Sequence, residues 1–473
     1  MIRASLRLAV CLFVLPLALG CASKPAWELP PPLPIDAPVV QGDALTRTEL
    51  ANGLEVLVLE DLRIPRVALS FSVRRGEAMV DPKRAGLASF TAGLMERGAG
   101  DRDALALATA VDEIGAGLSV SAGWDSMTVS VSGLSRDLPL LMEILGDVVL
   151  RPSFDRREAV RARTETLAAI EKAKDAPATL ASWYTYRALF EGHRYGIPAG
   201  GNTLTVAGLD DAAARRFHGE VFVPNNAIFA ASGDVQAETM IELANRIFGA
   251  MPPAEVPAAG PAPTLPAPAA TKILIVDRPD LEQAQIRVAH DGMARTDPDR
   301  VAVNIMNSTL GGSGFSSRLM KSVRSDAGLT YGVHSGFAMR RQPSLFVIST
   351  FTRVAEVRTV VDLLLAELER MRAEPPTESE LEQARTLATG SFSLGLETSD
   401  AVIGGLVDLD VHGLPEDALD TYRSRVRALT IDDTAREAQR RLHPDRVAIV
   451  LVGPAAQLQP QLDGLGPIEV VKP

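Results

Sequence analysis

The sequence divides into two halves that follow the same order of patterns, and this repeat limits the folds available to the chain. A segment of mostly proline and alanine, residues 251–271, separates residues 42–250 from residues 272–473. Such a composition cannot form a packed core, so we interpret the segment as a linker. Each half closes on an apolar strand between a proline and a glycine, and both pairs lie 220 residues apart: Pro224 and Pro444, Gly233 and Gly453.

The order of patterns within each half predicts the fold class. An apolar strand opens each half, at residues 56–61 and 273–277, and a strand with alternating apolar residues follows near Met127 and Leu345. An amphipathic helix, a proline break and a charged helix come next in both halves. We therefore expect an α+β fold of two homologous domains, each a largely antiparallel sheet with helices packed on one face.

The first 41 residues have the features of an export signal and a tether. Arg3 and Arg7 precede a short apolar run that is too short to span a bilayer as a mature helix, which indicates a signal peptide over residues 1–20. The run ends at Leu-Gly-Cys, similar to a bacterial lipobox, so we expect lipidation at Cys21 and, because no aspartate follows it, sorting to the outer membrane. A plain signal peptide with an incidental cysteine is the alternative. The proline-rich residues 21–41 suit an extended tether.

Composition narrows the functional classes. The formal net charge is −11, so the chain has no basic stripe with which to displace counterions from phosphates, and we expect no nucleic-acid binding. The only cysteines are Cys11 and Cys21, which predicts a mature body without disulfides or thiol ligands.

Three segments near the start of the first half resemble the pitrilysin/insulinase family of zinc peptidases: 52–56, 67–74 and Ala-Gly-Leu-Ala at 85–88. In active members, the last of these leads into His-x-x-Glu-His, whose two histidines bind zinc and whose glutamate is the general base. The resemblance aligns these three positions with Ser89, Ala92 and Gly93, and the family's third ligand, a downstream glutamate, with Ala169. It therefore implies that this chain binds no metal.

Other residues offer no substitute site in the sequence. Ser89 has no glycine two residues later, so it is not a nucleophile elbow, and residues 311–314 lack the ending of a phosphate-binding loop. The histidines are scattered without helical spacing and are interpreted as surface or structural residues: His193, His218, His290, His334, His412 and His443.

A segment of the second half, residues 310–331, resembles the family's glycine-rich loop, helix and Gly-Leu-x-Tyr signature. The resemblance implies that Arg324 and Tyr331 hold a substrate peptide, since active members use an arginine and a tyrosine seven residues apart for this purpose. We expect Arg324 in the last helical turn, Gly328 as a residue of positive φ after it, and Tyr331 just inside the next strand. Arg318 is the competing arginine, and its place suggests helix-surface or packing duty.

Some bacterial members of the family are heterodimers in which one subunit carries the zinc motif and the other supplies the arginine and tyrosine. The resemblance therefore implies a non-catalytic, lipid-anchored subunit on the periplasmic side of the envelope, with zinc in a homologous partner and peptides as substrates. Two alternatives stay open: a scaffold or peptide-binding module without a role in hydrolysis, and an independent peptidase with an unrecognised site.

The lipid anchor can be tested by replacing the residue that would carry it. We expect Cys21→Ala to move the chain from the membrane pellet to the soluble periplasmic fraction. Without acyl chains on Cys21, the proline-rich tether has no apolar group that could insert into the bilayer. Cell fractionation with immunoblotting measures this. A variant that stays in the membrane fraction after a salt wash contradicts the lipidation of Cys21.

Overall fold

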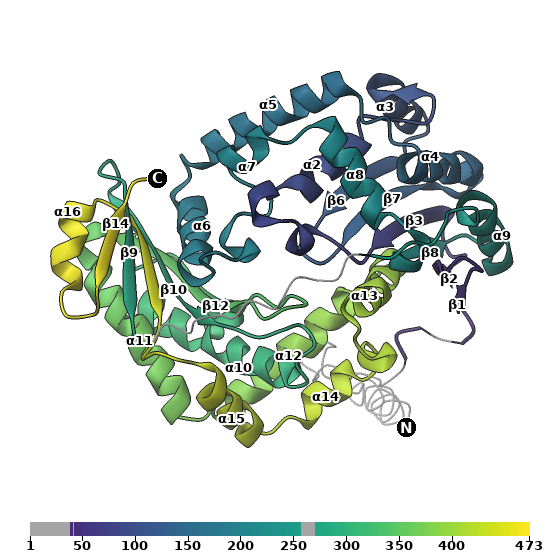
Figure 1. Cartoon of the computed structure of the whole chain (residues 1–473). Coiled ribbons are helices and arrows are strands. Elements are labelled where there is room, and N and C mark those ends of the chain that lie inside the picture. The colour runs from purple at the N-terminus through teal and green to yellow at the C-terminus, as the bar shows by residue number, and fades with distance from the viewer. Residues whose placement is uncertain (1–37, 41, 257–269) are drawn as a thin grey trace, which may run out of the picture. The chain divides into compact units, whose positions relative to one another are not determined.

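Two six-stranded sheets, one from each half of the chain, form the framework of the protein (Figure 1). The structure is a computed structural model that describes residues 38–40, 42–256 and 270–473. The signal peptide, Cys21, most of the tether and most of the linker lie outside the described residues.

The first sheet has the strand order β1-β2-β8-β3-β7-β6. Its neighbours are antiparallel except for β2 and β8, which run parallel. The sheet is mixed but mostly antiparallel, as the sequence predicts. Its strands are β1 (Leu45–Glu49), β2 (Glu55–Glu60), β3 (Arg66–Val73), β6 (Gly117–Ala122), β7 (Met127–Leu134) and β8 (Ala227–Gly233).

The second sheet has the order β11-β12-β10-β13-β9-β14, and five of its strands repeat the first sheet, while its edge strand β14 runs parallel to β9 where β1 is antiparallel to β2. Strands β9, β13, β10, β12 and β11 take the places of β2, β8, β3, β7 and β6, and β9 again runs parallel to β13. The repeat read from the sequence is therefore confirmed in the connectivity of the strands. The strands are β9 (Lys272–Asp277), β10 (Gln283–Asp291), β11 (Val333–Phe337), β12 (Leu345–Arg353), β13 (Ala448–Gly453) and β14 (Ile468–Val471).

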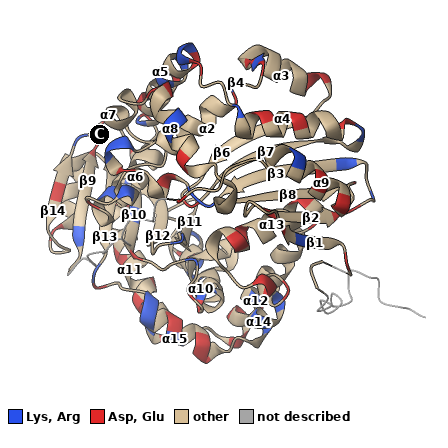
Figure 2. Ribbon diagram, turned by 45° about the vertical axis from the view of Figure 1, so that its right-hand side comes forward, with Lys and Arg blue, Asp and Glu red and all other residues tan. Residues whose placement is uncertain are grey.

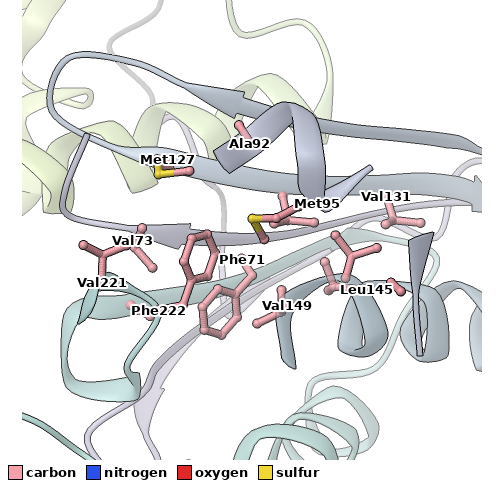
Figure 3. Close-up of a cluster of buried hydrophobic side chains, with 14 of the residues drawn as sticks. Phe71, Val73, Ala92, Met95, Met127, Val131, Leu145, Val149, Val221 and Phe222 are labelled. Atoms are coloured by element: carbon pink, nitrogen blue, oxygen red, sulfur yellow. The ribbon is translucent and has the colours of Figure 1, made fainter. Parts of the chain in front are cut away.

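Alternation along the strands places an apolar face of each sheet against its own helices. In β3, Phe71 and Val73 are fully buried, while Ser70 and Ala68 face the opposite side. Figure 3 shows Phe71 among side chains from β7, two neighbouring helices and residues 221–222. The predicted period of two therefore sets which face carries the core.

Four of the eight helices described in the first half begin at a residue whose side chain caps the helix. For example, Asp155 accepts hydrogen bonds from Arg157 N and Glu158 N at the start of α5. The eight helices are α2 (Leu87–Met95), α3 (Ala104–Glu113), α4 (Leu138–Leu150), α5 (Arg156–Ala173), α6 (Pro177–Leu189), α7 (Thr203–Ala207), α8 (Asp211–Val221) and α9 (Ala237–Phe248).

The second half follows the same scheme. Thr377 and Glu380 form a capping box at the start of α12, directly after the proline break that the sequence shows. Its helices are α10 (Arg300–Asn307), α11 (Val357–Ala373), α12 (Glu378–Leu394), α13 (Ser399–His412), α14 (Tyr422–Ala428), α15 (Ile431–Arg441) and α16 (Ala455–Leu458). Figure 2 shows acidic and basic residues interspersed along α5, α14 and α15.

Each half also sends one helix to the sheet of the other half. Helix α13 packs against the face of the first sheet that its own helices leave free, where Ile403 and Leu406 meet Leu57 and Ile228. Helix α6, which follows the long helix α5 as α13 follows α12, packs in the same way on β9, β10 and β13. Periodicity within one half does not reveal this exchange, because the covering helix comes from elsewhere in the chain.

The C-terminal end of α13 is fixed to the first half by His412. Its Nε2 lies 3.4 Å from Asp125 Oδ2 in the loop before β7, and its Nδ1 lies 3.1 Å from Asp408 Oδ1. Burial lowers the pKa of His412, but the hydrogen bonds with the two carboxylates outweigh burial and raise the pKa to about 9. His412 is therefore a positively charged link between the two halves at neutral pH.

Among the described residues, no helix combines the length and the apolar character that a membrane crossing needs.

The link at His412 predicts a pH dependence of stability. Because the pKa of His412 in the folded chain lies above its ordinary value of 6.5, its stabilisation is complete below that value and is lost as pH rises through about 9. We expect the free energy of unfolding to fall on the order of 2 kcal/mol between pH 7 and pH 10, measured by urea denaturation. The variant His412→Gln should be less stable at pH 7 and change less over this range. Equal pH slopes in both proteins contradict the link.

Candidate functional site

Helix α2 carries Ser89 and Gly93, the positions that the family resemblance aligns with zinc-binding histidines. Backbone N–H groups at the start of the helix point to the carboxylate of Glu77. Ser89 donates to Glu77 Oε1 from both its N–H and its hydroxyl at 2.8 Å, and Gly86 N donates to Glu77 Oε2 at 3.3 Å. Glu77 therefore caps α2 from outside the helix, and the Ser89 hydroxyl is committed to that cap.

Glu77 forms a buried ion pair with Arg194. The two side chains are 0% and 3% exposed, and Arg194 Nη2 lies 2.7 Å from Glu77 Oε2. Buried charges are tolerated only where hydrogen bonds replace their hydration. The Nη atoms of Arg194 meet this condition with further donations to the backbone carbonyls of Ile197, Pro198 and Ala199, while its buried Nε has no hydrogen-bond partner among the described residues.

The ion pair continues into an aromatic cluster that joins the two halves. The guanidinium of Arg194 lies 5.0 Å from the centroid of the Trp124 ring, and that of Arg340, in the loop after β11, lies 4.0 Å from the same ring. Arg340 is also 4.4 Å from the Tyr195 ring and 4.9 Å from the Tyr186 ring. Burial lowers the pKa of Arg340, yet a guanidinium stays protonated in proteins. The faces of three rings therefore surround the positive charge of Arg340 and stabilise it.

The remaining aligned positions supply no metal donor. Ala92 is a buried methyl group on the same helix as Met95, which points into the core cluster (Figure 3). Gly93 has no side chain, and Ala169 is exposed on α5. Zinc in proteins needs imidazole, thiolate or carboxylate ligands, so this donor set does not fit zinc. In the part of the chain that the structure describes, no three His, Cys, Asp or Glu side chains form a group able to hold a metal.

The fold gives partners to some histidines that look isolated in the sequence. His290 is fully buried, stacks on Phe346 at 4.7 Å between ring centroids, and has the ring of His443 at 5.1 Å. Burial lowers the pKa of His290 to about 4. The fold therefore brings together histidines that are scattered in the sequence, and the prediction of structural roles agrees with the burial of His290.

A cavity of about 390 Å³ lies between α13 and the hydroxyl-rich face of the first sheet. Ser70, Thr128 and Ser130 line its floor, and Asp400 at its rim forms an ion pair with Arg66. Hydroxyl groups can hydrogen-bond a polar chain, but a serine needs an adjacent base to act as a nucleophile. The lining of this cavity therefore suits hydrogen bonding to a ligand rather than nucleophilic catalysis.

Arg324 and Tyr331 lie on the segment between α10 and β11. Arg324 is in the last turn of a π-helical stretch, Met320–Asp326, and Gly328 after it has a φ of +66°, both as expected. Tyr331 lies in the loop before β11 rather than in the strand, and it is 80% exposed. The guanidinium of Arg324 lies 4.4 Å from the centroid of the Phe315 ring. Within the described residues, no hydrogen bond joins Arg324 to Tyr331.

Arg318, the competing arginine, has a structural role. It is 5% exposed, and it forms two hydrogen bonds with the carboxylate of Glu380, at 2.9 and 3.0 Å. It also donates to the carbonyls of Glu374 and Pro375. Its packing role agrees with the prediction, whereas a place on the helix surface is wrong. Its donors are occupied, so Arg324 is the arginine of this segment with free donors.

Sequence reasoning missed the residues that fill the aligned zinc position, Glu77 and Arg194. Nothing in the local pattern distinguishes Glu77 from a surface glutamate. The one local signal in the sequence is the glycine before it, Gly76, which can mark a constrained turn. In the structure, a Cβ on Gly76 would lie 2.3 Å from the carbonyl oxygen of Gly123. The aromatic residues Trp124 and Tyr195 are a second, weaker signal.

Comparison with protein families gives two matches that together span most of the described chain. A model described as insulinase (peptidase family M16) matches residues 56–202, and a model described as peptidase M16 inactive domain matches residues 209–387. The first match includes α2 and the second includes the segment with Arg324 and Tyr331.

Individual proteins show the same relationship. An uncharacterized zinc protease of Streptomyces coelicolor is 26% identical over 417 residues, covering 87% of this chain and 90% of that protein. One of Bacillus subtilis is 20% identical over 88% of this chain and 99% of that protein. A crystal structure of a peptidase M16 inactive domain from Pseudomonas fluorescens superposes with a TM-score of 0.81 at 26% identity, covering 87% of this chain and 98% of that one.

The Glu77–Arg194 pair predicts that Glu77 is a stability determinant. Glu77→Gln leaves Arg194 buried without its counter-charge, which should lower the free energy of unfolding by about 3–5 kcal/mol. Urea denaturation followed by circular dichroism measures this. Glu242→Gln, which neutralises an exposed glutamate on α9, is the matched control and should change stability by less than about 0.5 kcal/mol. A loss at Glu77 no larger than the control's contradicts the structural role.

Proposed function

Because the chain belongs to the insulinase family of peptidases, M16, and lacks that family's zinc ligands, we propose that it is the non-catalytic subunit of a heterodimeric zinc peptidase. Its partner is a homologous subunit with an intact His-x-x-Glu-His motif. Arg324 and Tyr331 of this chain bind the substrate peptide at the partner's zinc site and stabilise charge that develops on the peptide carbonyl. The chain acts on the periplasmic side of the envelope, held to the outer membrane through Cys21.

The contrast between the aligned zinc positions on α2 and the segment with Arg324 and Tyr331 supports this proposal. At the aligned zinc position, Ser89 serves as a hydrogen-bond donor to Glu77, and Ala92 and Gly93 carry no donor. The Arg324 guanidinium, by contrast, forms no ion pair within the described residues, and Tyr331 is 80% exposed. Decay of a whole enzyme predicts that both the zinc ligands and the arginine–tyrosine pair are lost. Division of labour between subunits predicts that only the zinc ligands are lost.

The chemistry of the two exposed groups fits a peptide carbonyl. A guanidinium has five N–H donors and a phenol has one O–H donor, so both can donate to a carbonyl oxygen. Donors that meet an oxyanion in a site closed to water are among the largest contributions to acyl-transfer catalysis. The arginine and tyrosine therefore need no general base of their own in this chain.

The test is co-expression with the homologous zinc-motif subunit and assay of a fluorogenic peptide. We expect Arg324→Ala with Tyr331→Phe to lower kcat/KM of the assembled complex by about 100-fold or more, comparable to the loss of one oxyanion donor. Leu204→Ala, which truncates a side chain 86% exposed at the start of α7, is the control and should leave kcat/KM unchanged. Size-exclusion chromatography confirms that every complex assembles.

Full activity of the double variant in an assembled complex contradicts the composite site. If the complex binds peptides but does not cleave them, the chain is a peptide-binding scaffold, the alternative function. Stoichiometric zinc in the isolated chain, measured by elemental analysis, also contradicts the proposal.

A further inference from the structure

The glycine-rich segment before Arg324 holds one aromatic side chain away from the core. Phe315 lies in a single turn, Gly314–Ser316, and is 70% exposed. Gly314 has a φ of +67°, which favours glycine, and a Cβ on Gly311 would lie 2.4 Å from Ser335 Oγ. The backbone is thus pressed against β11 at one end and reverses at the other. This geometry presents Phe315 on the surface, where a large apolar side chain gains little from burial.

Phe315 has one contact that accounts for its position. The guanidinium carbon of Arg324 lies 4.4 Å from the centroid of its ring, a distance at which a cation is attracted to the ring face. We propose that Phe315 is a positioning residue: its ring holds the Arg324 guanidinium in place and leaves the edge of that group free for a carbonyl or carboxylate oxygen of the substrate peptide. This inference rests on the proposed function of Arg324.

A ring face is suited to this task in a way that a carboxylate is not. A carboxylate partner would occupy two N–H donors and neutralise the charge, as Glu380 does for Arg318. A ring face is no carboxylate, so its contact with Arg324 neutralises no charge and leaves the N–H donors free of an ion pair. The N–H donors of Arg318 are therefore paired with Glu380 and two backbone carbonyls. Arg324, in the same segment, is held by the Phe315 ring, and within the described residues its N–H donors stay free for a ligand.

The backbone around the pair is also unusual. Two π-helical stretches, Ser308–Gly312 and Met320–Asp326, flank the turn that carries Phe315. Such i→i+5 segments are rare and are frequent at functional sites, where they change the direction in which a side chain leaves a helix. The second stretch contains Arg324, so its register contributes to the overlap of the guanidinium with the ring.

The experiment is a double-mutant cycle in the complex with the zinc-motif subunit, with the same fluorogenic peptide. We expect Phe315→Leu, which keeps an apolar side chain but removes the ring, to lower kcat/KM about two- to five-fold. Phe315→Tyr, which keeps the ring, should retain activity. In the Arg324→Ala background, Phe315→Leu should have no further effect, because a residue that acts only through Arg324 has nothing left to position. Melting temperatures of all variants should match, since Phe315 is exposed.

A second measurement uses the isolated chain and needs no partner. The Arg324 Nε–H resonance, assigned by its loss in Arg324→Lys, should move when Phe315→Leu removes the ring current, and it should stay near its original position in Phe315→Tyr. An unchanged resonance in Phe315→Leu overturns the stacking.

The outcomes separate this inference from the proposed function. If Arg324→Ala lowers activity but Phe315→Leu does not, the positioning role fails and the composite site stands. If Phe315→Leu lowers activity equally in both backgrounds, Phe315 contacts the substrate itself and the positioning role is again wrong. If Arg324→Ala has no effect, the composite site fails, and the role of Phe315 fails with it.

Discussion

The buried ion pair between Glu77 and Arg194 is the interaction on which the rest of the site depends. Glu77 accepts hydrogen bonds from N–H groups at the start of α2. Its partner Arg194 contacts the ring of Trp124, which also contacts Arg340 of the other half. Removal of either charge leaves the other without hydration, which is more costly than never having had the pair. The helix that would carry a zinc motif is therefore fixed by a network of charges and rings rather than by a metal.

This arrangement explains how a peptidase fold can lose its metal without losing the shape of the surrounding segment. Ser89 keeps the helix start satisfied, and Ala92 keeps the core side of α2 apolar. At Gly93, a Cβ would meet no atom within 4 Å, so the second ligand position is simply open. The start of α2 is thus held in place by side chains of this chain, while the aligned positions carry no metal donor.

The sequence predicted the parts that depend on local patterns. Period-two alternation indicated the strands near Met127 and Leu345, the repeat indicated two copies of one α+β unit, and Gly328 marked the end of the helix that carries Arg324. Two kinds of feature were out of reach. The exchange of α6 and α13 joins elements from different halves of the chain, and the partners of Glu77 converge from distant loops. Spacing carries no record of such contacts, so a buried glutamate looks like an exposed one until the fold is known.

The exchanged helices have a consequence for the order in which the chain acquires its structure. Leu180 of α6 packs on Val276 and Val452, and the latter is among the last strand residues to be synthesised. At roughly 5–20 residues per second, tens of seconds separate the synthesis of α6 from that of its complete binding surface. During that interval, the apolar face of α6 lacks the β13 part of its native surface, and the first sheet is still without α13. Neither half can complete its packing until α6 and α13 have each reached the sheet of the other half.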